Sequence, residues 1–80
     1  SFKIYPNPTS GLFTLEQTGQ FIAETIQAEI YGMRGEKVLT GEFSNELKHE
    51  FSFRDFPTGI YFVKIGTGKY VETFKLVKTR

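Results

Sequence analysis

The fold class is decided by residues 25–35, which read TIQAEIYGMRG. Ile26, Ala28 and Ile30 alternate with polar residues, so an apolar side chain recurs at every second position. That period is typical of a β-strand with one buried face, whereas an amphipathic helix repeats every 3.6 residues. Residues 32–35, GMRG, follow at once and predict a tight reversal of the chain.

A helix is the competing interpretation for residues 23–30, because several of these residues are good helix formers. Thr25, Ile26 and Ile30 are β-branched, however, and β-branched side chains favour strands. The alternation and the branching therefore predict a strand over residues 25–31.

Six further stretches fit the same reading, with turn residues between them at spacings of about 8–12 residues. They are residues 2–5, 12–17, 36–43, 47–53, 60–65 and 69–79. Such spacing is typical of an antiparallel sandwich or barrel. We predict one all-β domain over residues 1–80, a seven-stranded antiparallel β-sandwich of the Ig-like kind.

Aromatic residues supply most of the expected core, since the chain has nine Phe and four Tyr but no Trp. An 80-residue domain buries only about 60–65% of its unfolded surface, so large inward side chains are needed. Alternation points the following side chains inward: Phe13, Leu15, Ile26, Ala28, Ile30, Phe51, Phe53, Tyr61, Val63 and Ile65.

The charge and cysteine counts exclude several classes of partner. Ten basic residues against nine acidic ones argue against nucleic acid, which requires a basic surplus on one face. The absence of Cys excludes disulfides and Cys-ligated metals, and no apolar run reaches the roughly 20 residues of a transmembrane segment. The chain begins Ser1-Phe2-Lys3 without Met or a signal peptide, so we expect a fragment of a longer precursor or a processed product.

No group of side chains predicts a catalytic, metal or cofactor site. His49 is the only His and has no second ligand in the sequence, so we expect a structural role at a surface strand position. Asp55, the only Asp, precedes Phe56-Pro57 and is expected to cap a turn.

Exposed aromatic rings allow a second interpretation, an Ig-like adhesion or carbohydrate-binding module of a secreted protein. Sugars stack on exposed rings, and Tyr31 falls on the face opposite Ile26, Ala28 and Ile30. This interpretation requires an exposed aromatic platform and saturable glycan binding.

Four segments of the chain match one family pattern in order. They are residues 5–13 (YPNPTSGLF), 30–38 (IYGMRGEKV), 53–63 (FRDFPTGIYFV) and 74–78 (FKLVK). Together they resemble the type A C-terminal sorting domain of the type IX, or Por, secretion system of Bacteroidetes. Phe56 stands where the family often has Leu, and Gly32 stands where it often has Asn.

The motif residues also have physical reasons to be present. Prolines remove donors and stiffen the exit from the first strand, and Gly11 and Gly35 suit positive φ or a close approach. Pro57 sets φ for a turn, and Gly59 lets the chain enter the next strand without a Cβ clash. From the resemblance we expect these residues to form recognition motifs: Pro6, Asn7, Pro8, Gly11, Gly35, Pro57, Gly59, Tyr61, Lys75, Val77, Lys78 and Arg80.

The resemblance implies a secretion signal rather than an enzyme. Such a domain directs its cargo from the periplasm across the outer membrane through the type IX translocon. A sortase-like cysteine protease then removes it at the cell surface, cutting upstream of the domain, and the cargo is released or attached to lipopolysaccharide. The resemblance therefore implies no cofactor.

The final strand is the expected handle for recognition, through addition of a partner strand at an exposed edge. Val71, Thr73, Lys75 and Val77 alternate with inward residues, which places Lys75 on the outer face. Lys75, Lys78 and Arg80 make the terminus basic, which also protects an edge strand from aggregation. Exposed edges further allow a homodimer.

Overall fold

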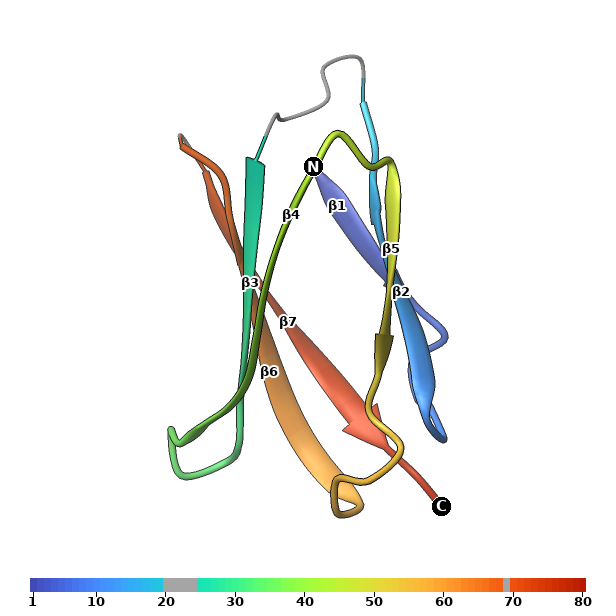
Figure 1. Cartoon of the computed structure of the whole chain (residues 1–80). Helices are drawn as coiled ribbons and strands as arrows, with labels where there is room; N and C mark the ends of the chain where they lie inside the picture. The colour runs from blue at the N-terminus through green and yellow to red at the C-terminus, as the bar shows by residue number, and fades with distance from the viewer. Residues whose placement is uncertain (20–24, 69) are drawn as a thin grey trace.

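Seven antiparallel strands form a β-sandwich in the computed structural model, which describes residues 1–19, 25–68 and 70–80. The strands are β1 (Phe2–Tyr5), β2 (Leu12–Gln17), β3 (Thr25–Tyr31), β4 (Lys37–Ser44), β5 (Lys48–Ser52), β6 (Gly59–Gly66) and β7 (Val71–Lys78). They build a three-stranded sheet, β1-β2-β5, and a four-stranded sheet, β4-β3-β6-β7 (Figure 1). The predicted all-β sandwich is confirmed, and residues 25–30 are strand rather than helix; residues 23 and 24 lie outside the described part.

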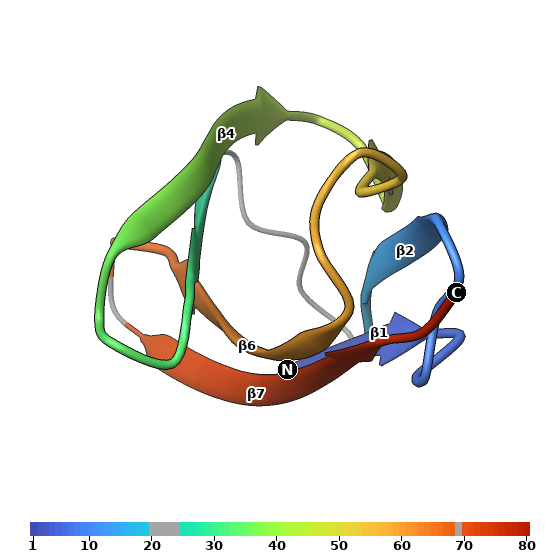
Figure 2. The ribbon, with the colours of Figure 1, turned by 90° about the horizontal axis from the view of Figure 1, so that it is seen from below.

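The strand order explains the Ig-like character and one departure from it. In an Ig constant domain, the first, second, fourth and fifth strands share one sheet. Here β4 pairs with β3 and so belongs to the other sheet. Figure 2 looks at the sandwich from one end, with β1 and β2 on one side and β4, β6 and β7 around the other.

The core lies between the two sheets and is built by the predicted alternation. Each of the side chains predicted to point inward is buried. The ring of Phe13 from β2 stacks on Phe51 of β5 at 5.2 Å between centroids, and meets Phe53 edge-on at 6.0 Å. Phe53 in turn meets Tyr61 of β6 edge-on at 4.6 Å, so one aromatic cluster joins both sheets.

Strand ends differ from the prediction by one or two residues. β5 covers Lys48–Ser52 rather than residues 47–53, although the Phe53 N–H still donates to the Gly11 C=O at 2.6 Å, at the next position of the β2–β5 register. β7 begins at Val71 rather than at Lys69, and Lys69 lies outside the described residues, as does Gln20 of the turn expected after β2. Among the residues described, no helix has the length and apolarity required to span a membrane.

Candidate recognition surface along the final strand

β7 is the outermost strand of the four-stranded sheet, as the sequence predicted for the final strand. On one side it pairs with β6 over its whole length. Val71, Thr73 and Lys75 are exposed on the outer face, whereas Leu76 is fully buried. The predicted assignment of the Lys75 side to the outer face is therefore confirmed.

The carboxamide of Asn7 binds the other side of β7. Its Nδ2 donates to the Lys75 C=O at 2.6 Å, and its Oδ1 accepts from the Val77 N–H at 2.9 Å. A carboxamide carries one donor group and one acceptor group, as a peptide unit does, so Asn7 replaces a peptide of a neighbouring strand.

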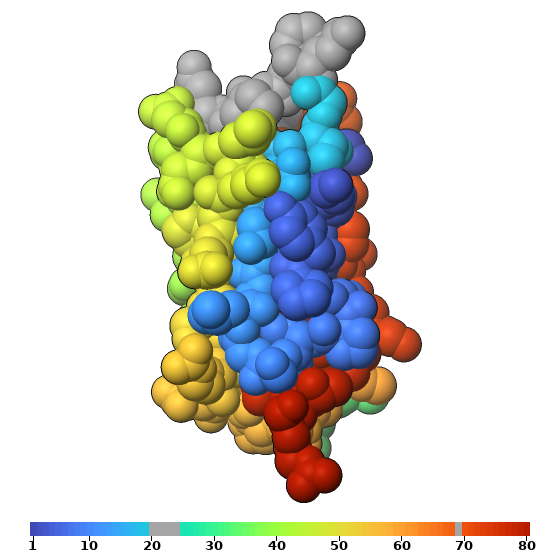
Figure 3. Space-filling model, turned by 90° about the vertical axis from the view of Figure 1, so that its right-hand side faces the viewer, coloured from blue at the N-terminus to red at the C-terminus, as the bar shows by residue number. Residues whose placement is uncertain are grey.

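Thr9 continues this contact as a backbone bridge. Its N–H donates to the Val77 C=O at 2.9 Å, and its C=O accepts from the Thr79 N–H at 2.8 Å, which forms a parallel bridge beside Lys78. We call residues 7–9 the Asn7–Thr9 clasp. In Figure 3 the first turn of the chain, in blue, lies directly against the red C-terminal end.

Burial of Thr9 makes the clasp part of the folded framework. Thr9 is 1% exposed, and its hydroxyl donates to the Leu12 C=O at 2.6 Å and accepts from the Gly11 N–H at 3.1 Å. Every polar group of Thr9 therefore has a partner, as burial requires. The first and last motifs of the sequence thus meet at one edge of one sheet.

The basic residues of the terminus are divided between two environments. Lys75 and Arg80 are exposed, but Lys78 is 6% exposed because it continues the inward series of Leu76. Its Nζ donates to the Thr79 C=O at 3.1 Å at the end of the sandwich. A buried stem with a hydrogen-bonded ammonium is usual for such a lysine, and Lys78 adds little to the exposed surface.

A small charged network lies on the outer face of the four-stranded sheet. Lys37 Nζ lies 3.0 Å from Glu29 Oε2, and the Tyr31 hydroxyl donates to Glu29 Oε1 at 2.9 Å. The hydrogen bond from Lys37 is the main cause that lowers the pKa of Glu29, and the hydrogen bond from Tyr31 is the second. The same contact with Glu29 raises the pKa of Lys37 and of Tyr31.

This network predicts an acid-dependent contribution to stability. A carboxyl with a lowered folded-state pKa stabilises the fold above its ordinary value of 4.5, and the contribution is lost as pH falls through the folded value. We expect Glu29→Gln to lose less stability than the wild type between neutral pH and about pH 3 in urea denaturation. Glu50→Gln, an exposed change on the other sheet, should keep the wild-type difference; equal acid sensitivity of Glu29→Gln and wild type would contradict the expectation.

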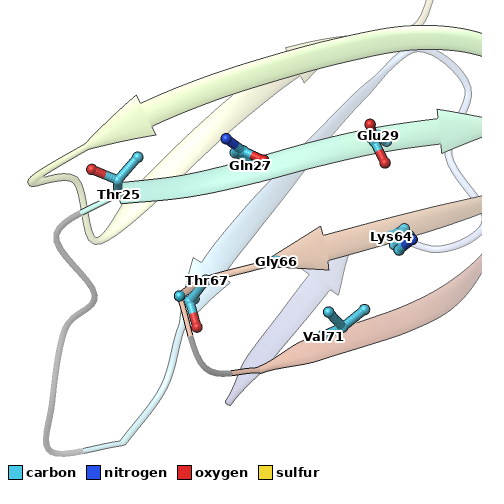
Figure 4. A pocket seen from close by; sticks show the side chains of 8 residues that line it. Thr25, Gln27, Glu29, Lys64, Gly66, Thr67 and Val71 are labelled. Atoms are coloured by element: carbon cyan, nitrogen blue, oxygen red, sulfur yellow. The ribbon is translucent and has the colours of Figure 1, made fainter.

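An open groove of about 460 Å³ crosses this outer face beside the start of β7 (Figure 4). Its walls come from β3, β6, the β6–β7 hairpin and β7: Thr25, Gln27, Glu29, Lys64, Gly66, Thr67, Gly68 and Val71. None of these lining residues is aromatic. Tyr31 does lie on this outer face, as predicted, but it is half-buried and its hydroxyl is committed to Glu29.

Of the three turn-motif glycines, Gly35 has the role that the sequence predicted, whereas the reasons predicted for Gly59 and Gly11 are wrong. Gly35 has φ of 84° and Gly59 has φ of 149°, so both adopt conformations that other residues rarely take. Space around the Gly59 Cβ position is open, so φ rather than a clash requires glycine. Gly11 was wrongly predicted: its φ is not positive, and an added Cβ would lie 3.6 Å from Arg54, an ordinary contact.

Tyr61 closes the Pro57-Thr58-Gly59 turn from inside the core. Its ring is buried, and its hydroxyl donates to the Pro57 C=O at 2.7 Å, four residues upstream. Burial, with a smaller effect of Glu36, raises the pKa of Tyr61. A Tyr at the start of the sixth strand that binds the preceding loop is the tyrosine corner of Ig-like sandwiches.

Removing this hydroxyl should weaken the fold modestly. We expect Tyr61→Phe to lower the free energy of unfolding by about 1 kcal/mol, because the Pro57 carbonyl loses its partner. Urea denaturation measures the loss. Tyr70→Phe is the matched control, since Tyr70 is 69% exposed and should change stability little; a Tyr61→Phe variant as stable as this control would contradict the assignment.

Neither residue that was considered for chemistry forms a reactive site. His49 is not at the surface position predicted for it but half-buried, with its ring stacked 4.3 Å from that of Phe43 across the two sheets. Asp55 is exposed, and the Phe56 N–H closes the turn on the Phe53 C=O at 3.3 Å, so the predicted cap is wrong. Within residues 1–19, 25–68 and 70–80, no cluster of His, Asp and Glu could hold a metal ion.

Sequence reasoning missed two positions, Thr9 and Gly41. Thr9 resembles an ordinary turn residue in the sequence, and only its distant partners reveal its role. Gly41 lies opposite Ala28 in the ladder, and a Cβ there would come 3.0 Å from the Phe51 ring. A glycine inside a strand is a recognised sign of such a close approach, so this position was detectable.

Comparison with known proteins supplies the family. Residues 3–79 match the model of the secretion system C-terminal sorting domain, a range that includes residues of all seven strands and the Asn7–Thr9 clasp. No curated protein matches the chain. The family is a signal rather than a catalyst, and it directs cargo across the outer membrane to the cell surface or beyond. Because this match covers residues 3–79 of the 80, the chain belongs to the C-terminal sorting domains of the type IX secretion system.

Proposed function

We propose that the domain is the C-terminal export label of a longer secreted precursor, and that the secretion machinery reads it along β7. The main support is that the first and last family motifs lie together at the free edge of β7, where Asn7 binds Lys75 and Val77. Because the first and last motifs form one exposed structure, a single component of the secretion machinery can bind both.

The architecture suits a label that is recognised while folded. Its interior is filled by apolar and aromatic side chains, and its outer groove is open to solvent. An edge strand offers backbone groups to any extended partner, whatever the cargo in front of the domain. Recognition that depends on the label alone allows one machine to export many cargoes.

Two finer steps follow from the family. A sortase-like cysteine protease is the proposed enzyme that removes the domain at the surface, by cutting in the chain upstream of it. The cargo is then released or attached to lipopolysaccharide. A domain freed in this way keeps its exposed edges, through which two copies can pair.

A reporter fusion tests the export function. The domain is attached to the C-terminus of a periplasmic reporter in a competent strain, and surface reporter is measured with and without the domain. We expect surface delivery only with the domain; retention of the complete fusion in the periplasm would refute the proposal.

Charge reversal on the outer face tests whether the secretion machinery binds the domain along β7. Lys75→Glu should reduce delivery at least about tenfold, because Lys75 is exposed beside the edge and an interface tolerates like charges poorly. Lys48→Glu reverses an exposed charge on the other sheet and should leave delivery unchanged. Equal delivery by both variants would place the reader away from β7.

A further inference from the structure

The free edge of β7 is divided into a covered half and an open half. In an antiparallel strand, the N–H and C=O of one residue point to the same side, and successive residues alternate. Val77 and the Lys75 C=O point away from β6, because they bind the Asn7–Thr9 clasp. The N–H and C=O groups of Val71 and Thr73 therefore also point away from β6, and no described residue binds them there.

Exposure of the side chains agrees with an accessible open half. Val71 is 62% exposed, and Thr73 and Lys75 are exposed as well. The clasp shows that outward backbone groups of this edge accept partners from outside the sheet, because Asn7 binds them through its side chain and Thr9 through its backbone. The covered and open halves belong to the same strand edge.

We propose that the open half, residues 71–75, binds one extended strand of the secretion machinery by backbone pairing, and that the Asn7–Thr9 clasp sets where that strand ends. The inference rests on the proposed export function and names the contact that the reader makes. It confines the added strand to about five residues, because the Lys75 C=O and the next outward N–H, that of Val77, already bind Asn7.

Charge on the outer face defines the chemistry of the partner strand. Lys64 of β6 lies opposite Thr73 in the ladder, and Lys75 follows two residues later on the same face. Both are exposed. Glu29, which lies opposite Lys64 in the β3–β6 ladder, forms its ion pair with Lys37 and interacts more weakly with Lys64. A partner strand with an acidic side chain beside Thr73 fits this surface.

Proline at residue 73 tests the contact without breaking the sheet. Because the Thr73 N–H points away from β6, Thr73→Pro removes a group needed only by an added strand, and proline is tolerated on edge strands with this orientation. Thr73→Val is the matched control, since it keeps the N–H and alters the same side chain. Both variants are made in the reporter fusion, and folding is checked by urea denaturation of the purified domain.

We expect Thr73→Pro to fold and to reduce surface delivery at least about tenfold, while Thr73→Val is delivered like the wild type. Delivery of folded Thr73→Pro at the wild-type level overturns the strand-addition proposal and leaves the export function intact. Failure of the wild-type fusion itself refutes the export function instead. If Thr73→Pro does not fold, Val71→Pro removes the other outward N–H at the start of the strand and is judged by the same two outcomes.

Discussion

Replacing Phe53 by alanine is expected to lower the free energy of unfolding by about 3–5 kcal/mol. Phe53 is completely buried, and its ring lies 4.5 Å from that of Phe56 and 4.6 Å from that of Tyr61. It also meets Phe13 of the three-stranded sheet, whereas Tyr61 belongs to the four-stranded sheet, so truncation leaves a cavity where both sheets join. A domain of this size has a total stability of only about 4–12 kcal/mol, so the loss consumes much of it.

Urea denaturation of the purified domain measures this loss. Phe62→Ala is the control, because Phe62 is half-buried on the outer face and its truncation should cost about 1 kcal/mol. A Phe53→Ala variant no less stable than Phe62→Ala would show that the aromatic cluster does not hold the sheets together. In the reporter fusion, we expect the Phe53→Ala domain to lose export as well, since an unfolded label presents no sheet edge.

Replacing Thr9 by valine is expected to cost about 1–3 kcal/mol. Valine keeps the volume but removes the hydroxyl, which leaves the Leu12 C=O and the buried Gly11 N–H without this partner. The shape of the core is preserved, so the loss reports the hydrogen bonds rather than a cavity. The bridge from the first turn to the last residues of β7 should loosen with it.

Hydrogen exchange of backbone amides shows where the loosening occurs. We expect faster exchange at Thr79, whose N–H donates to the Thr9 C=O, and unchanged exchange at Val63 in the middle of β6. Thr58→Val is the control, because Thr58 is exposed in a turn and its change should alter neither stability nor exchange. Wild-type stability of Thr9→Val would mean that the two hydroxyl bonds of Thr9 contribute nothing to the stability of the clasp.

Most of the fold could be predicted because its causes are local. Alternation of apolar residues identified the inward face of each strand, and Gly35 and Pro57 marked turns from their own backbone preferences. His49 could not be placed in the same way. Its half-buried position depends on Phe43 of the opposite sheet, a contact that alternation in one strand does not reveal.

The candidate recognition surface was predicted only in part. The last strand and the exposure of Lys75 followed from its order in the chain and from alternation. The burial of Lys78 was available from the same alternation, but its charge suggested exposure. The clasp was not foreseeable, because the bond from Asn7 to Lys75 spans 68 residues.

The sequence by itself determined that this chain forms seven short strands, which side chains face the core, and the family to which it belongs. Those properties depend on residue type, on spacing within each strand and on turn chemistry. Only the tertiary structure decided that β4 joins the sheet of β3, and that Asn7 and Thr9 cover half of the final edge. Pairing of strands and capping of an edge are set by contacts between residues far apart in sequence, and the division of β7 into a covered and an open half arises from them.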